Sequence, residues 1–395
     1  MKLKPFIKFS FSLLLFNCNT DVVDDIVENE TKQIEIAQRT TDYLDYGVYW
    51  FNSENESVKA YDENAGEPIE VSTSFYDDSK PTVVYFHGWQ QDTAIDNYRR
   101  ETFQFTDTDN GVNVNTVKEW KNRGWNVAIF YWNQFADEAE VKHAEAKIWS
   151  TNGTQKMRYR LSDGSYSENQ SPSDPMGIVS FNQLSELLAN NTSNNVRFVG
   201  HSLGNQLATY TAFLFSEALE NGEISSKIMP DRLELLDPFW SKGAKPYLGD
   251  YNGDRSPDWT GERGRWYISE MIDRNNLAVT WYNSTLILNS GIGDSNQNLK
   301  DIVALQSVRF WYVSSIDIVD KHINARHNYF WSFSFDAPKE VTINWFNRRR
   351  ETGNVAASAS TSIGRIRSMM GDDHIWDQVE GRYTATPSDD MFEIK

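Results

Sequence analysis

The sequence contains a single cysteine, Cys18, in 395 residues. One thiol cannot close an internal disulfide, so the stability of the fold must come from core packing. Positive charge is scarce as well, because 38 Lys and Arg residues stand against 56 Asp and Glu residues, a net charge of -18. Such a chain repels phosphate backbones, and we therefore predict that nucleic acid is not among its partners.

Long hydrophobic runs are almost absent, and none predicts a transmembrane helix. At the start, lysines at positions 2, 4 and 8 precede the short run FSFSLLLF, a pattern typical of a signal peptide in residues 1–18. Cys18 follows directly, where a bacterial lipoprotein carries its lipid-modified cysteine, although Asn17 replaces the small residue usual before it. We predict export, either as an outer-membrane or cell-surface lipoprotein anchored through Cys18 or as a secreted protein. A cytoplasmic protein with an apolar start is the alternative.

Hydrophobic residues nevertheless make up 39% of the chain and aromatic residues 14%, enough to build a large core. Apolar segments of strand length alternate with longer helical patterns, and the clearest are residues 82–86, 126–131, 196–199 and 233–236. This alternation predicts an α/β fold with a mostly parallel central sheet and helices on both faces. Ligands of such folds bind beyond the carboxyl ends of the strands.

Composition divides the chain into regions. Residues 19–42 are acidic and polar, which predicts a tether, and residues 43–350 form the predicted catalytic domain. Within that domain, residues 242–300 are rich in Asn, Asp, Gly and Ser and predict an insertion or lid over the strand ends. Residues 351–395 follow a run of three arginines and predict a C-terminal appendage packed on the body.

A serine stands between an apolar strand and a helical pattern, in the segment VRFVGHSLG at residues 196–204. This setting of a GxSxG motif predicts the nucleophile elbow of an α/β-hydrolase fold, with Ser202 as the nucleophile. The glycines two positions before and after the serine are needed because the turn is strained and side chains there would collide with the helix. An ordinary strand-to-helix turn is the alternative.

A serine hydroxyl needs a histidine to take its proton and an acid to orient that histidine. In this fold the acid and then the histidine follow the serine along the chain. Asp237 ends a predicted strand and is our candidate acid, whereas a turn or cap aspartate is the alternative.

Only three histidines follow that aspartate: His322, His327 and His374. We favour His322 as the base because it precedes a helical pattern and a loop before a helix suits a solvent-reaching imidazole. His327 is the alternative base, placed a turn or more into that helix. His374 follows two aspartates, which suggests a cation site instead.

The oxyanion of the tetrahedral intermediate needs two preorganised donors. The N–H of Leu203, directly after the serine, supplies the first. Residues 82–86 run into His87 and Gly88, so that the N–H of Trp89 is our candidate for the second. A buried His-Gly turn is the alternative.

Three segments resemble the matching segments of the pancreatic and lipoprotein lipase family, which includes phospholipases A1: PTVVYFHGW (81–89), VGHSLG (199–204) and LLDP (235–238). The resemblance covers about residues 82–332 and implies hydrolysis of lipid esters. The chain departs from the family by lacking disulfides, by a longer gap between serine and aspartate, and by having no following domain of β-sandwich size. These departures leave triglyceride specificity and a colipase-like partner without support.

The resemblance also implies roles for individual residues. Trp89 and Leu203 match the oxyanion-hole positions of the family, and Asp237 matches the aspartate of its LDP segment. The catalytic histidine of the family precedes an aromatic pair and a serine. His322, which precedes Tyr329, Phe330 and Ser332, matches it with a small shift in spacing.

These motifs together predict a serine carboxylic-ester hydrolase that works through an acyl-enzyme and needs neither a metal nor an organic cofactor. A small-ester or amide hydrolase is the alternative enzyme, and a surface lipoprotein that only binds ligands is the alternative from another class. Residues 248–254, with Asp258 beyond them, place oxygen ligands at alternate positions as calcium loops do. We favour a polar turn there and keep calcium as the alternative.

Overall fold

The computed structural model describes residues 43–96, 99, 101–108, 110–285, 293–344, 346 and 348–395. The predicted signal peptide with Cys18 and the predicted tether lie outside the described residues, and so do residues 286–292 of the predicted insertion. Within the described part of the chain, every helix is too short or too polar to cross a bilayer.

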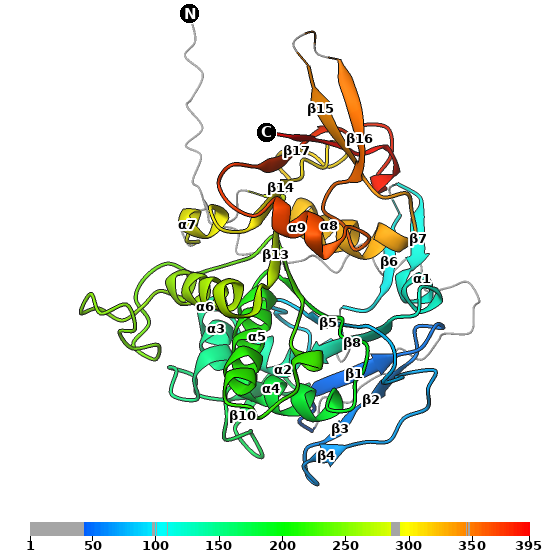
Figure 1. Ribbon diagram of the computed structural model, residues 1–395. Coiled ribbons are helices and arrows are strands. Elements are labelled where there is room, and N and C mark those ends of the chain that lie inside the picture. Colours follow the sequence, from blue (N-terminus) through cyan, green and yellow to red (C-terminus); the bar gives the residue numbers. More distant parts are fainter. Residues whose placement is uncertain are drawn as a thin grey trace, which may run out of the picture. The chain divides into compact units, whose positions relative to one another are not determined.

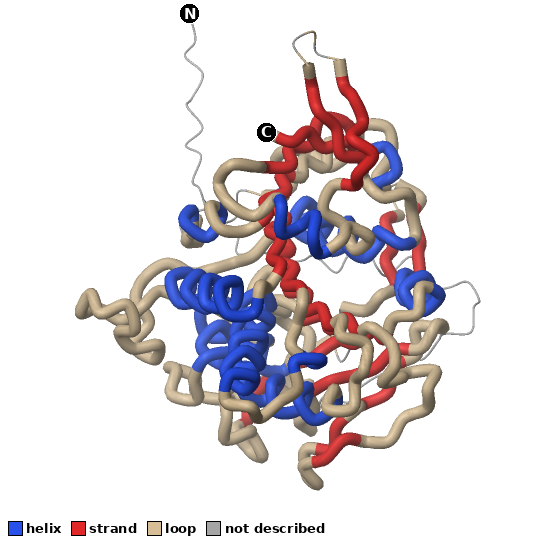
Figure 2. The backbone as a smooth tube through the Cα atoms, viewed as in Figure 1, coloured by secondary structure: helices blue, strands red, loops and turns tan. Residues whose placement is uncertain are grey.

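The core is a twelve-stranded sheet with the order β16-β15-β18-β17-β14-β13-β12-β11-β5-β8-β1-β2 (Figures 1 and 2). From β8 to β17 every neighbouring pair is parallel, whereas β1 pairs antiparallel with β8 and with β2. The strands of this sheet are β1 (Gly47–Phe51), β2 (Ser57–Lys59), β5 (Thr82–Phe86), β8 (Asn126–Tyr131), β11 (Val196–His201), β12 (Arg232–Leu236), β13 (Ala278–Asn283), β14 (Ala304–Ser307), β15 (Lys339–Ile343), β16 (Arg349–Val355), β17 (Ile375–Glu380) and β18 (Met391–Ile394).

Three two-stranded sheets lie beside the central one. They comprise β3 (Tyr61–Asp62) with β4 (Glu67–Pro68), β6 (Gln104–Asp107) with β7 (Val112–Asn115), and β9 (Tyr159–Arg160) with β10 (Tyr166–Ser167). The helices are α1 (Thr116–Asn122), α2 (Asn133–Ala136), α3 (Val141–Trp149), α4 (Met176–Leu187), α5 (Gly204–Glu220), α6 (Thr260–Asn275), α7 (Gln297–Lys300), α8 (Ile318–Phe330) and α9 (Ile363–Ser368), with short 3-10 turns at Ser226–Ile228, Trp331–Phe333 and Pro387–Asp389.

The central strands are buried on both faces because helices cover the sheet from both sides. Along β5, for example, Val84 and Phe86 belong to one hydrophobic cluster and Val83 and Tyr85 to the other. The first cluster includes residues of α3, α4, α5 and α6, and the second includes residues of α1, α8 and α9. Near-continuous apolar strands are the expected signature of a parallel sheet buried in this way. The predicted α/β fold is therefore confirmed.

Two predicted regions turn out to contain sheet elements. Residues 242–300 include α6, the central strand β13 and α7, so that this segment is not a simple inserted loop. Residues 351–395 contribute β17 and β18, and the predicted boundary at 350 falls inside β16. The C-terminal segment is thus built into the sheet rather than packed on it, because β17 pairs in parallel with β14.

Candidate active site

Ser202 stands at a strained turn between β11 and α5. Its φ of 55° lies in the left-handed region, which non-glycine residues rarely adopt. A Cβ at Gly200 would lie 2.5 Å from the Cα of Asn205, and a Cβ at Gly204 would collide with the carbonyl oxygens of Phe86 and His87. The two glycines are therefore required by close backbone contacts, as a nucleophile elbow demands.

Asp237 directly follows β12, the parallel neighbour of β11, and therefore lies at the same edge of the sheet as Ser202. Its side chain is 2% exposed. The carboxylate accepts hydrogen bonds from the N–H groups of Ser284 (3.0 Å) and Thr285 (3.1 Å) and from the Thr285 hydroxyl (2.5 Å). Burial alone raises the pKa of Asp237, but the hydrogen bond and charge of His322 and these other donors outweigh it and lower the pKa.

His322 completes the pair, since its Nδ1 atom lies 2.6 Å from Oδ2 of Asp237. With Nδ1–H donated to the carboxylate, Nε2 is the nitrogen that can accept a proton. His322 lies in the second turn of α8, which begins at Ile318, and not in a loop before the helix as we predicted. The helix starts early because the Asp317 side chain caps it by accepting the N–H of Asp320 at 3.2 Å.

The other two candidate histidines lie in different surroundings. His327 is buried in α8, where Nδ1 is 2.9 Å from Oδ1 of Asn324 and the ring stacks on Trp331. Burial and the neighbouring Arg326 lower the pKa of His327 well below its ordinary value. His374 is exposed in the turn before β17. The structure therefore brings His322 to Asp237 and brings neither of the alternatives there.

The loop after β5 contacts the serine turn. A Cβ at Gly88 would lie 2.8 Å from Cβ and 3.4 Å from Oγ of Ser202, so that only glycine allows this approach. Within the described residues, the backbone N–H groups of Trp89 and Leu203 donate no hydrogen bond. Two donors next to the serine are thus available for an oxyanion.

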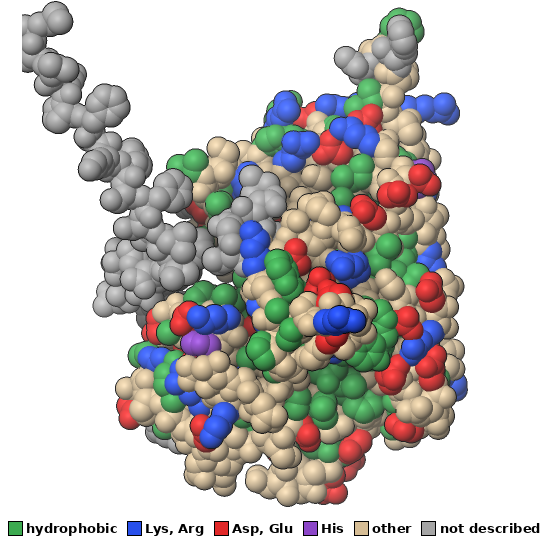
Figure 3. Space-filling model, turned by 90° about the vertical axis from the view of Figure 1, so that its left-hand side faces the viewer, with side chains coloured by type: hydrophobic (Ala, Val, Ile, Leu, Met, Phe, Trp, Pro, Cys, Tyr) green, Lys and Arg blue, Asp and Glu red, His purple; other side chains and the backbone are tan. Residues whose placement is uncertain are grey.

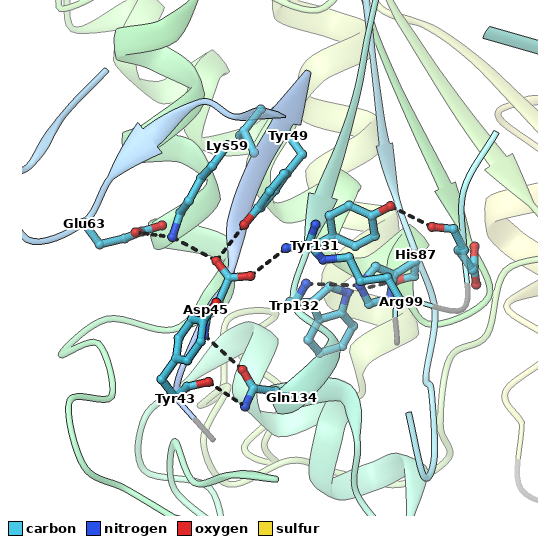
Figure 4. A network of polar contacts seen from close by, with 12 residues as sticks. Tyr43, Asp45, Tyr49, Lys59, Glu63, His87, Arg99, Tyr131, Trp132 and Gln134 are labelled. Atoms are coloured by element: carbon cyan, nitrogen blue, oxygen red, sulfur yellow. Dashed lines mark hydrogen bonds and ion pairs between the residues drawn. The ribbon is translucent and has the colours of Figure 1, made fainter. Parts of the chain in front are cut away.

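His87 holds this loop in place (Figure 4). Its Nε2 accepts the N–H of Trp132 at 3.1 Å, which leaves Nδ1–H to donate to the carbonyl of Gly88 at 2.9 Å. The indole N–H of Trp132 donates to the carbonyl of His87 at 2.9 Å. Burial lowers the pKa of His87 to about 4, so the ring is neutral and supports the turn through its hydrogen bonds.

A charged network secures the neighbouring edge of the sheet (Figure 4). The carboxylate of Asp45 accepts hydrogen bonds from Arg99 (2.6 Å), Tyr49 (2.8 Å) and Lys59 (2.9 Å). The Arg99 guanidinium lies over the rings of Tyr49 and Tyr131, 3.8 and 4.3 Å from their centroids. Because Tyr131 ends β8 directly before Trp132, the network stiffens the strand that supports the His87 loop.

His201, which directly precedes Ser202, is a further residue of the site for which the motif indicates no separate role. Its ring lies 4.5 Å from the ring of His322, and its Nε2–H donates to the backbone carbonyl of His322 at 2.9 Å. Burial and the adjacent His322 lower the pKa of His201 to about 3, so that the ring is neutral. Ser284 contacts the same turn of α8, because its hydroxyl donates to the carbonyl of Lys321 at 3.0 Å.

In residues 248–258, where we predict a polar turn with calcium as the alternative, the aspartates bind groups of the protein itself. Asp250 accepts the N–H groups of Gly253 (2.7 Å) and Arg255 (2.9 Å), and Asp258 pairs with Arg263 at 2.9 Å. Among the described residues there is no group of three or more His, Cys, Asp or Glu side chains that could hold a metal ion. The loop is thus a turn held by aspartates, and calcium stays an untested alternative.

The parallel sheet, the serine at a strained strand-to-helix turn and the later aspartate and histidine define an α/β-hydrolase fold. No family model matches the chain, and no curated protein matches it. The family resemblance to the pancreatic and lipoprotein lipases therefore rests on the three short motifs alone.

Solved structures of the same fold class are weakly similar. One is a protein from Lactobacillus plantarum assigned as a carboxylesterase, with 10% identity, 56% of this chain and 70% of that chain covered, and a TM-score of 0.28. Another is the acylaminoacyl peptidase of Pyrococcus horikoshii, with 10% identity, 53% and 28% covered, and a TM-score of 0.26. A third is an esterase from Thermogutta terrifontis with bound butyrate, with 12% identity, 62% and 69% covered, and a TM-score of 0.24. Similarities this low carry no argument about the substrate.

Proposed function

We propose that this protein is a serine hydrolase that cleaves carboxylic esters, with Ser202 as nucleophile, His322 as base and Asp237 as the residue that orients the base. The observation that carries the proposal is the buried hydrogen bond between Asp237 and His322 at the sheet edge where Ser202 occupies a strained turn. A pair of residues that only stabilised the fold would need neither a nearby serine in a left-handed conformation nor two free backbone N–H donors beside it. The combination of these features therefore favours catalysis.

The proposed reaction proceeds in two balanced steps. Nε2 of His322 takes the proton of the Ser202 hydroxyl while Oγ attacks the ester carbonyl, and the N–H groups of Leu203 and Trp89 stabilise the oxyanion. The alkoxide leaves with the proton from His322, which gives an acyl-enzyme and an alcohol. Water, deprotonated by the same imidazole, then attacks the acyl carbon and releases the acid and the free serine.

The substrate class is a separate question. Lipid esters follow from the resemblance of the three motifs, whereas small soluble esters or amides are the alternative for the same machinery. Hydrolysis of p-nitrophenyl esters of increasing acyl length, with and without an emulsion interface, separates them. Faster turnover of long esters at the interface supports the lipid proposal, and a preference for short soluble esters overturns it.

The test of the proposed reaction itself uses matched variants. We expect Ser202→Ala to abolish measurable hydrolysis of every ester in that series and to keep the melting temperature within a few degrees of wild type. Equal hydrolysis by wild type and variant would contradict the role of Ser202. No hydrolysis by well-folded wild type would favour the non-catalytic binding protein.

We also propose that the chain is exported and anchored through a lipid on Cys18, on the evidence of the N-terminal sequence alone. Metabolic labelling with a radioactive fatty acid should mark the wild type and leave Cys18→Ser unlabelled. Unlabelled wild type found in the culture medium would favour plain secretion.

A further inference from the structure

Helix α6 borders two adjacent hollows, each of about 270 Å³, that the proposed reaction does not use. Glu262 and Arg265 line both of them, so that the hollows adjoin along one face of the helix. We call the pair the α6 trough. Each hollow is slightly below the ~300 Å³ at which pockets for drug-sized ligands begin, and fits a single ring.

Aromatic rings stand along the trough at intervals. Trp259 lines the first hollow, and Tyr251 and Trp266 line the second. Tyr251 is 59% exposed, and its ring centroid lies 4.2 Å from that of Trp266 at an angle of 44°. An exposed aromatic ring that a second ring holds in place offers an apolar face to a ligand, and little side-chain entropy is lost when the ligand binds.

The remaining lining consists of planar polar groups. Arg265 donates to Oδ1 of Asn296 at 2.7 Å, and among the described residues its other N–H groups have no partner and can bind a ligand. Glu262 accepts the N–H of Trp259 through Oε2 at 2.8 Å, which leaves Oε1. The exposed amides of Gln297 and Asn298 complete the first hollow. Planar amides, carboxylates and guanidinium groups bind paired neighbouring hydroxyls well.

The charges of the lining further restrict the class of ligand that the trough can bind. The first hollow is lined by the carboxylates of Glu262 and Asp294 and by one guanidinium, that of Arg265, so that acidic groups outnumber basic ones. On a chain of net charge -18, such a lining disfavours anionic ligands. Acidic, basic and hydrophobic side chains are interspersed on the side of the molecule where α6 and α7 lie (Figure 3). A mixed polar lining suits a neutral polyhydroxylated ligand better than an acyl chain.

One backbone hydrogen bond connects the trough to the chain segment that follows Asp237. The N–H of Asp294 donates to the carbonyl of Trp240 at 2.8 Å. Trp240 is only three positions after Asp237, and three extended residues span at most ~11 Å. The first hollow is therefore connected to the segment that carries the candidate acid, which lies at the same edge of the sheet as Ser202.

We propose that the α6 trough binds a neutral oligosaccharide and that the ester cleaved at Ser202 is carried by such a carbohydrate. The second half of this inference rests on the proposed function, and the first half stands on the trough alone. Aromatic platforms alternating with planar hydrogen-bonding groups match the apolar faces and paired hydroxyls of pyranose rings.

Binding is tested on the Ser202→Ala variant, in which turnover is removed. Isothermal titration calorimetry with β-1,4-linked hexasaccharides of glucose, xylose and mannose should give saturable binding to at least one of them. Tyr251→Ala in the same background should weaken that binding about ten-fold because it removes the exposed platform. Tyr383→Ala, which removes an 83% exposed ring elsewhere on the chain, is the matched control and should bind like its parent.

Binding to none of the three hexasaccharides overturns the proposal, and so does equal binding by the Tyr251 and Tyr383 variants. Arg265→Ala is a second test, because this substitution removes a polar lining group and no packed aromatic ring. Unchanged affinity in both Tyr251→Ala and Arg265→Ala would also contradict the proposal. The melting temperature of each variant shows whether it is folded.

Catalysis is tested on the enzyme with an intact serine. Tyr251→Ala should raise KM for acetylated hexasaccharide about ten-fold and leave kcat/KM for p-nitrophenyl acetate unchanged, because the small ester does not reach the trough. Equal effects on both substrates overturn the carbohydrate inference and leave the hydrolase standing. Hexasaccharide binding without hydrolysis of any ester overturns the proposed function and leaves the trough standing.

Discussion

The Nδ1 atom of His322 lies 2.6 Å from the Oδ2 atom of Asp237, although 85 positions separate the two residues in the chain. The aspartate follows a strand and the histidine sits on a helix, and Ser284 contacts both the aspartate and that helix. Asp237 accepts backbone N–H groups from the end of β13, and His201 and Ser284 hold the turn of α8 that carries His322. The imidazole is thus oriented before a substrate arrives.

The two histidines of α8 should differ sharply in their effect. His322→Ala should lower kcat for a soluble ester by about 10⁴-fold, because it removes the base that is paired with Asp237. His327→Ala should keep kcat within about ten-fold and instead lower the melting temperature, since the ring packs between Phe105 and Trp331. Steady-state kinetics and calorimetry on both variants check this. An active His322 variant beside an inactive His327 variant would reverse the assignment.

Asp237→Asn should lower kcat by about 10⁴-fold while KM changes little. An amide cannot stabilise the imidazolium, and it can present an N–H to Nδ1 that favours the wrong tautomer. The kinetics should be accompanied by hydrogen-bond-sensitive NMR of His322, in which the downfield Nδ1 proton disappears. Retention of that proton with full activity would show that another group orients the histidine.

Gly88→Ala should lower kcat by about 10²-fold or more, because the added Cβ would come 2.8 Å from Cβ of Ser202 and displace the loop that carries the Trp89 donor. Gly364→Ala is the matched control, since nothing lies within 4 Å of a Cβ built there. Its activity and melting temperature should equal those of wild type. Full activity in the Gly88 variant would remove this loop from the oxyanion site.

Asp390 predicts a pH dependence of stability that is separate from catalysis. Burial and the neighbouring Asp389 raise the pKa of Asp390 to about 8, and its carboxyl group accepts a hydrogen bond from the Gln378 amide at 2.8 Å. An unfolded aspartate ionises near pH 4, so between about pH 4 and about pH 8 the folded state holds a proton that the unfolded state has lost. Stability should therefore fall as the pH rises through this window.

Calorimetry at pH 5 and pH 8 tests this, with Asp390→Asn as the comparison. The asparagine keeps the shape of the protonated acid and cannot ionise, so the difference in melting temperature between the two pH values should shrink. An unchanged difference would show that other groups cause the pH dependence.

The sequence predicted β5, β8, β11 and β12 because parallel strands buried on both faces have near-continuous apolar sequences. It also predicted Ser202 and Asp237, since both directly follow such strands. β5 and β8 have the bounds that the sequence gives them, and β11 extends two residues further, through Gly200 and His201.

Other parts of the fold have weaker signals in the sequence. β13 was overlooked because it follows α6 inside a segment dominated by polar loop residues, and with it Ser284 and Thr285 were missed as partners of Asp237. Asp317 at the start of α8 is a regular helix cap and could have placed His322 inside the helix. The contact between the rings of His201 and His322 depends on the path of the chain between β14 and α8, which no local pattern encodes.

The most direct measurement of the central claim is covalent labelling of the folded protein with a fluorophosphonate, followed by mass spectrometry of its peptides. We predict one modified residue, Ser202, with labelling lost in Ser202→Ala and slowed by orders of magnitude in His322→Ala. Modification of a different serine, or equal labelling of the Ser202→Ala protein, would contradict the account.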